Sequence, residues 1–342
     1  MKKNDKIIIG IVVLIILSIG IGLTISLSNK KEEEEKIEEK REEKEEKIIQ
    51  VFDMDSKDRP LAVVINNTPV AVKVQEGLQD AYLIYEFPTE GNTSRLLALF
   101  QNQANLEVGT IRSVRHNFID YANENDAILV GYGWSKYARA ELEKGDTDYV
   151  NGMVHSTVFH RNNPENLAWE HTAYTTLDKV KNFARSKYRM ESEVKPPLNY
   201  SVEEITLDNY ESQSAKNIIL NYGPSNQENY KYNEESKMYE RYFNQTPSLD
   251  YKTKETLQVK NIIITTLTAS PVVLNSKYLD LHNTGSKEGY YITNGKAIKI
   301  TCSKETRNGR TKYLDEQGKE IVLNDGKTLI ALFLKGKEMK IE

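Results

Sequence analysis

The chain has 342 residues, of which 39% are hydrophobic and 28% are charged, and its formal net charge is -4. This length accommodates one large domain or two ordinary ones. No domain of the chain is basic, which excludes the charge pattern typical of a nucleic-acid-binding domain. The single cysteine, Cys302, excludes an intrachain disulfide and a thiolate metal cluster. It lies in an alternating stretch, so we expect a small buried side chain there, with a nucleophile as the alternative.

The run IIIGIVVLIILSIGIGLTISL, residues 7–27, contains no charged residue. A segment of about 20 apolar residues crosses a bilayer core, and this run is longer than the usual core of a cleaved signal peptide. The sequence predicts a retained membrane anchor over 1–29 that spans from Ile7 to Leu27, with the rest of the chain outside the cytoplasm. Cleavage after Ser28 is the alternative. No cysteine follows the span closely, which excludes lipid attachment of the lipoprotein type.

Residues 30–49 begin with a run of lysines, glutamates and one arginine, KKEEEEKIEEKREEKEEK. Ile37 is the only apolar residue of this run, so there is no stripe that a coiled coil could bury. Opposite charges four residues apart favour some helix. We expect a solvated charged linker between the membrane and a folded head.

Residues 50–195 alternate short apolar runs with amphipathic segments, which is typical of an α/β layered domain. Apolar runs bounded by turn residues predict strands over 61–65, 82–87, 95–101 and 127–132. Helical spacing and capping residues predict helices over 75–81, 115–125, 135–145 and 176–187, of which the last two begin at Ser135 and Thr176.

Residues 196–214 are polar, contain two adjacent prolines and predict a connector. Residues 215–342 consist of short segments of β type, so we expect a second, β-rich and mostly antiparallel domain. Asn294-Gly295 and Asn308-Gly309 are the strongest hairpin signals, because both central residues of a type I′ turn have positive φ. The predicted fold class is therefore an α/β domain followed by a β-rich domain.

Polar residues interrupt the apolar stretch between residues 81 and 135. These residues are Glu86, Glu90, Arg95, Arg112, Ser113, Arg115 and Ser135. Fixed ionic groups beside a core need partners, so we expect both carboxylates to pair with arginines and to have lowered pKa values. Arg112 and Arg115 lie at a bend before a predicted helix, which suits an anionic ligand. Structural salt bridging is the alternative for the whole cluster.

Two carboxylates across a cleft can also hydrolyse a glycosidic bond, one as the acid and the other as the base or nucleophile. Glu86 and Glu90 are the candidates for that chemistry, although pairing with arginines disfavours a general acid. His155, His160 and His171 are five and eleven residues apart, which is not a diagnostic metal-site spacing. The residues thus predict no metal and no other cofactor.

Five segments of the chain carry a family resemblance: RPLAVVINN, YLIYEFPTEGNTSRLLALF, VGTIRSVRHNFIDYA, HTAYTT and DEQGKEIVLNDGKTLIALF. Over roughly residues 50–340 they resemble the YerB-like bacterial envelope lipoproteins, which have paired N- and C-terminal domains of unknown function 3048. The resemblance implies an envelope protein and supplies no reaction. It implies ten characteristic polar positions, namely Asn66, Glu86, Glu90, Thr93, Arg95, Arg112, Ser113, Arg115, His171 and Tyr174. The chain departs from the family in lacking the lipid-bearing cysteine.

The sequence as a whole predicts a single-pass, membrane-anchored protein with an extracytoplasmic head. We expect this head to bind an anionic envelope ligand or a protein partner without catalysis, through Arg112 and Arg115 with Glu86 and Glu90. The alternative is a peptidoglycan hydrolase that uses Glu86 or Glu90.

Overall fold

The computed structural model describes residues 30–31, 48–101 and 103–342. The chain divides into two units, residues 1–48 and 49–342, and the second holds every element named below. The expected membrane anchor, its alternative cleavage site and nearly all of the expected linker lie outside the described residues. Among the residues that are described, no helix is long and apolar enough to cross a membrane.

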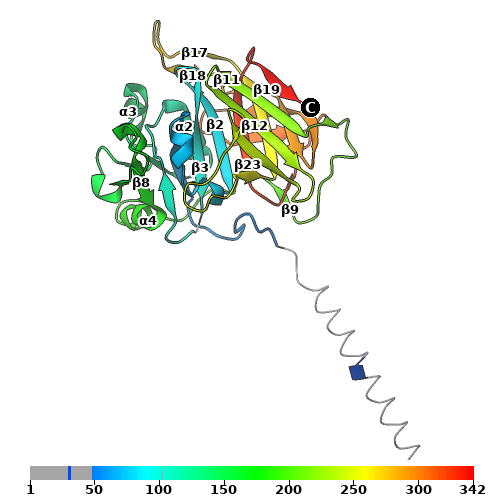
Figure 1. Cartoon of the computed structure of the whole chain (residues 1–342), viewed down its shortest axis with the longest axis horizontal. Coiled ribbons are helices and arrows are strands. Elements are labelled where there is room, and N and C mark those ends of the chain that lie inside the picture. Colours follow the sequence, from blue (N-terminus) through cyan, green and yellow to red (C-terminus); the bar gives the residue numbers. More distant parts are fainter. Residues whose placement is uncertain (1–29, 32–47, 102) are drawn as a thin grey trace, which may run out of the picture. The chain divides into compact units, whose positions relative to one another are not determined.

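The second unit is a mixed α/β structure with few helices and many strands (Figure 1). Its α-helices are α2 (His116–Glu124), α3 (Lys136–Leu142) and α4 (Leu177–Arg185). Four 3₁₀ turns accompany them: η1 (Ala71–Val74), η2 (Leu78–Asp80), η3 (Ser156–Val158) and η4 (Trp169–His171).

The main sheet has eleven strands. In spatial order they are β10 (Gln213–Ser214), β20 (Lys296–Lys304), β19 (Gly285–Thr293), β16 (Asn261–Leu267), β23 (Thr328–Leu334), β2 (Leu83–Thr89), β3 (Thr93–Phe100), β1 (Leu61–Asn67), β5 (Ile128–Gly131) and β6 (Tyr149–Asn151), with β21 (Thr311–Leu314) paired to β20.

A second sheet has six strands. They are β14 (Thr246–Pro247), β13 (Met238–Phe243), β12 (Asn226–Asn233), β11 (Asn217–Gly223) and β24 (Met339–Ile341), with β15 (Gln258–Val259) paired to β13. Three small sheets complete the unit: β4 (Glu107–Gly109) with β8 (Ala173–Thr176) and β7 (His160–Arg161), β17 (Ala269–Pro271) with β18 (Leu279–Leu281), and β22 (Leu323–Asn324) with β9 (Tyr200–Ser201).

The main sheet takes strands from both segments that the sequence suggested as separate domains. β23 pairs in parallel with β2 on one side and with β16 on the other. The segments 50–195 and 215–342 therefore share one sheet, and the C-terminal segment is not purely antiparallel. The expected connector, 196–214, contributes the short strands β9 and β10.

Alternation along β1 shows how the layers are built. Leu61, Val63 and Ile65 belong to one core, whereas Ala62 and Val64 belong to the other. The first core also takes residues of α4 and the six-stranded sheet, and the second takes residues of α2 and α3. Among the described residues, the buried core begins at residue 52, so we expect residues 48–342 to fold on their own.

Most predicted elements are present. The side chain of Ser135 accepts a hydrogen bond from Ala138 N at 3.1 Å and caps α3 as predicted, whereas Thr176 precedes α4 without a side-chain cap. The helix predicted over 75–81 is wrong: only the turn η2 forms, because Gly77 before it has a φ of 76°.

The two hairpin signals have different outcomes. Asn294 and Gly295 have φ values of 49° and 72° and join β19 to β20, which confirms the first turn. Asn308-Gly309 lies between β20 and β21, but neither residue has positive φ. The hairpin itself forms, because β20 and β21 pair as antiparallel strands, but its connection is longer than the two-residue type I′ turn. Gly309 N closes a turn onto Thr306 O at 3.1 Å. Cys302 is buried, as expected, and burial raises the pKa of its thiol to about 12.

Candidate functional site

Three arginines meet where β3 begins and where the chain enters α2. Arg95 lies on β3, directly opposite Asn66 of β1 in the strand register. Arg112 and Arg115 lie on the segment between β4 and α2, which is tied to the sheet because Arg112 N donates to Val64 O at 2.9 Å. The main sheet is therefore the scaffold of this arginine cluster.

Arg115 holds Glu90 in a bidentate ion pair. Arg115 Nε donates to both carboxylate oxygens of Glu90 at 3.1 Å, and Nη2 donates to Oε1. The ring of Tyr278, from the connection between β17 and β18, lies 5.2 Å from the guanidinium carbon. Burial opposes ionisation of Glu90, but the hydrogen bonds and charge of Arg115 prevail and lower its pKa. The sequence predicted that Glu90 pairs with one of the three arginines, and the structure shows that this partner is Arg115.

Arg95 has no carboxylate bonded to it within residues 48–101 and 103–342. Its side chain is only 6% exposed, and its Nη1 donates to the carbonyl oxygen of Ser113 at 2.8 Å. Burial and the charges of Arg115 and Arg112 lower its pKa to about 9, against the opposing charge of Glu90. A guanidinium in these surroundings is stabilised by any anion that reaches it.

Arg112 pairs with an exposed carboxylate. Its Nη2 lies 3.2 Å from Glu170 Oε1, and the Glu170 side chain is 58% exposed. The Nε atom of Arg112 is buried and has no hydrogen-bond partner among the described residues. Such an unsatisfied donor in a charged group is costly unless a ligand or solvent reaches it.

His171 connects this arginine to the sheet. Asn66 Nδ2 donates to His171 Nδ1 at 2.8 Å, and His171 Nε2 lies 3.5 Å from Glu170 Oε1. Burial and the charge of Arg112 lower the pKa of His171. A neutral ring therefore adds no positive charge at neutral pH, and it carries its proton on Nε2.

Three of the polar positions implied by the family resemblance have structural partners. Thr93 Oγ1 donates to Glu90 O at 3.2 Å within the turn between β2 and β3. Ser113 Oγ donates to Tyr132 O at 3.1 Å. The hydroxyl of Tyr174 is buried and donates to the carbonyl oxygen of Val74 at 2.6 Å. These side chains shape the surroundings of the site, and their polar atoms bind the protein itself.

Glu86 does not join the arginine cluster, contrary to the sequence prediction. Strand alternation places it on the face of β2 opposite to Phe87, and Phe87 is the residue that pairs with Arg95. Glu86 is fully buried, and its Oε1 accepts a hydrogen bond from Ser94 Oγ at 2.6 Å. Burial and the charge of Glu228 raise its pKa to about 8 despite Arg241, so the lowered pKa expected from arginine pairing is wrong.

The surroundings of Glu86 form a second polar cluster that sequence reasoning missed. Arg241 of β13 donates to both oxygens of Glu228 of β12 at 2.8 Å, and its Nη2 donates to Asn67 Oδ1 at 2.6 Å. Asn67 Nδ2 in turn donates to Glu228 Oε1 at 2.8 Å. This buried network joins the two sheets. Glu228 and Arg241 are 13 residues apart on neighbouring strands, but their contacts with Asn67 span 161 and 174 residues, and no local sequence signal indicates contacts of that length.

The three histidines have separate partners. His155 Nδ1 accepts from Asn151 N at 3.2 Å, and His160 Nε2 lies 3.3 Å from Glu107 Oε1. Within the described ranges, no group of three or more histidine, cysteine or acidic residues is arranged to hold a metal ion.

Comparison with known proteins assigns the chain to a family. The N-terminal domain of a protein of unknown function (DUF3048) matches residues 50–191, and the corresponding C-terminal domain matches residues 218–330. The chain belongs to the DUF3048 family. The resemblance to YerB-like proteins seen in the sequence is thus confirmed.

Two findings from Bacillus subtilis support the DUF3048 assignment. "Putative lipoprotein YerB" of strain 168 is 31% identical over 279 residues, which are 79% of this chain and 77% of that protein. The crystal structure of B. subtilis YerB matches with a TM-score of 0.71 and 29% identity, over 81% of this chain and 91% of that one. Neither the family nor this relative carries a stated activity.

Proposed function

We propose that the chain is a membrane-anchored envelope protein whose head binds an anionic ligand at the arginine cluster without catalysis. The anchoring part of the proposal is supported by the uncharged run 7–27 and by the description of the YerB relative as a lipoprotein. A retained anchor in place of a lipid would hold the head at the same membrane surface.

One observation carries the binding proposal: three guanidiniums converge, and the buried one has no carboxylate bonded to it among the residues described. Glu90 is held by Arg115, and the exposed Glu170 is the nearest acid to Arg112. The cluster therefore has one more positive charge than negative, next to a sheet that fixes its geometry. Planar guanidiniums are suited to bidentate recognition of phosphate or carboxylate groups.

A calorimetric titration of residues 48–342 with inorganic phosphate tests the site. Phosphate should bind, and Arg112→Gln should weaken binding by about tenfold. Because the Arg112 side chain is partly exposed, this variant should keep its thermal stability in the absence of phosphate. The matched control is Arg139→Gln, which removes an arginine that is 60% exposed and pairs with Glu143 on α3.

Two results would count against the arginine cluster as a binding site. The first is an absence of phosphate binding in the millimolar range, and the second is equal phosphate affinity in Arg112→Gln and the unaltered protein. If Arg112→Gln unfolds the head, the arginine is a structural salt-bridge residue instead.

The geometry does not favour the alternative of a cell-wall hydrolase. Glu86 is fully buried between the two sheets, so it cannot reach a polysaccharide without unfolding. Glu90 has a lowered pKa and both of its oxygens accept from Arg115, whereas a general acid needs a raised pKa. Incubation of residues 48–342 with peptidoglycan should accordingly release no soluble fragments.

A further inference from the structure

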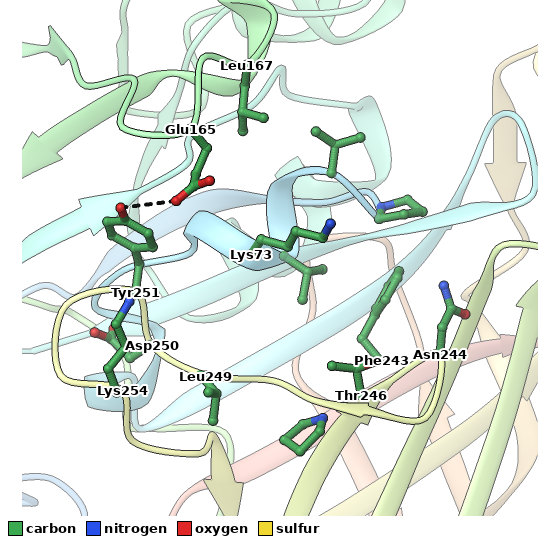
Figure 2. A pocket seen from close by; sticks show the side chains of 14 residues that line it. Lys73, Glu165, Leu167, Phe243, Asn244, Thr246, Leu249, Asp250, Tyr251 and Lys254 are labelled. Carbon is green, nitrogen blue, oxygen red and sulfur yellow. Dashed lines mark hydrogen bonds between the residues drawn. The ribbon is translucent and has the colours of Figure 1, made fainter.

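A pocket of about 690 Å³ opens where distant parts of the chain meet, and it shares no lining residue with the arginine cluster. Figure 2 shows its walls. They come from the chain leaving β1 and entering η1, from the loop between β7 and η4, from β13 and β14, and from the loop that follows β14. The volume lies within the range of about 300–1,000 Å³ found for small-molecule sites.

The lining is largely apolar and changes from buried to exposed. Val72 and Phe243 are buried, whereas Val70 and Leu249 are 44% and 40% exposed. Leu167 and two prolines extend the same surface. Exposed apolar side chains that continue into a buried apolar lining are typical of a site that an apolar group enters.

The acidic groups of the pocket already accept hydrogen bonds from other residues of the protein. Asp250 accepts hydrogen bonds from the backbone N–H of Gly77 at 2.7 Å and of Lys252 and Thr253 at 2.9 Å. Glu165 accepts from the hydroxyl of Tyr251 at 3.4 Å, an interaction drawn in Figure 2. These partners hold the loop after β14 in place and reduce the negative charge that a ligand would meet.

The two lysines of the pocket are the groups that can pair with an acidic ligand. Lys73 is exposed, reaches across the middle of the pocket in Figure 2, and makes no hydrogen bond or ion pair with any residue of 48–101 or 103–342. The ammonium group of Lys254 lies over the ring face of Tyr251, with Nζ 4.1 Å from the ring centroid. The pocket thus combines apolar walls with a lysine ammonium group that can pair with an acid.

The neighbouring sheet edge does not favour an extended peptide as the occupant. β14 is the edge strand of the six-stranded sheet, but it has two residues and one of them is Pro247. Proline lacks the backbone N–H that strand addition would use. A compact ligand is better matched to a pocket of this volume.

We propose that this pocket binds an anionic amphiphile, a molecule with an apolar chain or ring system and one acidic head group. The head group pairs with Lys73, and the apolar part packs against Val70, Leu249 and Phe243. The site is separate from the arginine cluster, so it takes a different ligand and does not depend on the function proposed above.

Calorimetric titration of residues 48–342 with decanoate and with decanol, each below its micellar concentration, tests the proposal. Decanoate should bind at least about tenfold more tightly than decanol, because only the carboxylate pairs with Lys73. Lys73→Met should weaken decanoate binding by about tenfold and leave decanol binding unchanged, since the substituent keeps the apolar stem.

Two further variants test whether the charge of the pocket, and not a change in folding, determines the affinity for decanoate. Glu165→Gln removes the acid that opposes the ligand, so it should strengthen decanoate binding by a few fold. Lys319→Met is the matched control, because this exposed lysine lies outside the pocket and its loss should change neither affinity.

Three outcomes would overturn the proposal. They are an absence of decanoate binding, equal affinities for decanoate and decanol that Lys73→Met does not alter, and a concentration-dependent dimer whose formation blocks decanoate. The last outcome, seen by sedimentation, would identify a second copy of the chain as the occupant.

Discussion

Glu86 should make the folded head less stable as the pH rises from about 4.5 to about 8. Burial, reinforced by the charge of Glu228, raises the pKa of Glu86 to about 8, whereas an exposed glutamate has a pKa of 4.5. Between these two values the folded protein retains a proton that the unfolded chain has lost. The free energy of unfolding must therefore fall as the pH increases through this interval.

The size of the effect follows from the two pKa values. One pH unit corresponds to about 1.4 kcal/mol, so the whole interval corresponds to about 5 kcal/mol. This is comparable with the entire stability of a small domain. Glu86→Gln has no proton to lose. Its amide oxygen still accepts from Ser94, and its NH₂ group can donate to Glu228 as the protonated acid does.

Urea denaturation of residues 48–342 and of the Glu86→Gln variant, repeated from about pH 4 to about pH 8.5, measures this effect. Near pH 4.5 the two should differ by less than about 1 kcal/mol. By pH 8, where Glu86 is half ionised in the folded head, the variant should be the more stable by about 4 kcal/mol. A difference that does not change with pH would show that Glu86 is ionised in the folded head, and it would refute the reasoning.

Glu90→Gln is a control variant whose stability, relative to the unaltered protein, should change with pH in the opposite direction. Although burial opposes it, the contacts of Arg115 lower the pKa of Glu90, so its ionised form stabilises the folded head above the unfolded pKa. Glu90→Gln should therefore be less stable than the unaltered protein at neutral pH. That deficit should shrink as the pH falls below 4.5, the ordinary pKa of glutamate, and should disappear once Glu90 is protonated in the folded head, which is the reverse of the Glu86 result.

Three other substitutions should act through single contacts. Ser135→Ala removes the cap of α3 and should lower the unfolding free energy by about 1 kcal/mol in urea denaturation, a loss that would be absent if the cap were unimportant. Arg241→Met leaves Glu228 buried without its charged partner and should cost about 3–5 kcal/mol in the same assay; a neutral result would mean that the network is not closed. Tyr174→Phe loses the hydrogen bond to Val74, should cost about 1 kcal/mol and should leave phosphate affinity unchanged, whereas weaker phosphate binding would make Tyr174 a ligand contact.

Individual helices and caps could be predicted from the sequence because the residues that determine them lie close together in the chain. The helix predicted over 115–125 is α2, and the serine that should cap α3 does so. The partnership of β2 with β23 was not readable, since these parallel strands are more than 230 residues apart and no turn connects them. For the same reason no sequence signal indicated that one sheet runs through both segments.

The candidate site was predictable in part. Glu90 and Arg115 lie in a turn and at a helix start, where side-chain direction does not depend on strand alternation, and they pair as expected. Glu86 and Arg95 lie within adjacent strands, so their faces depend on the register. The pairing of Phe87 with Arg95 turns Glu86 to the other side of the sheet, and no feature of the sequence fixes that register.

The polar residues of β1 to β3 acquire two roles from this alternation. On one face, Asn67, Ser94 and Glu86 meet the six-stranded sheet and are closed off by Arg241. A fully satisfied buried network of this kind can fix how two sheets meet, although it adds little net stability.

On the opposite face, Asn66 and Arg95 meet the segment that enters α2, where the guanidiniums outnumber the acids. The same three strands thus hold a closed ionic network on one side and an unbalanced cluster on the other. Charge balance therefore separates the structural network from the cluster that we propose as a binding site, which residue type alone could not do.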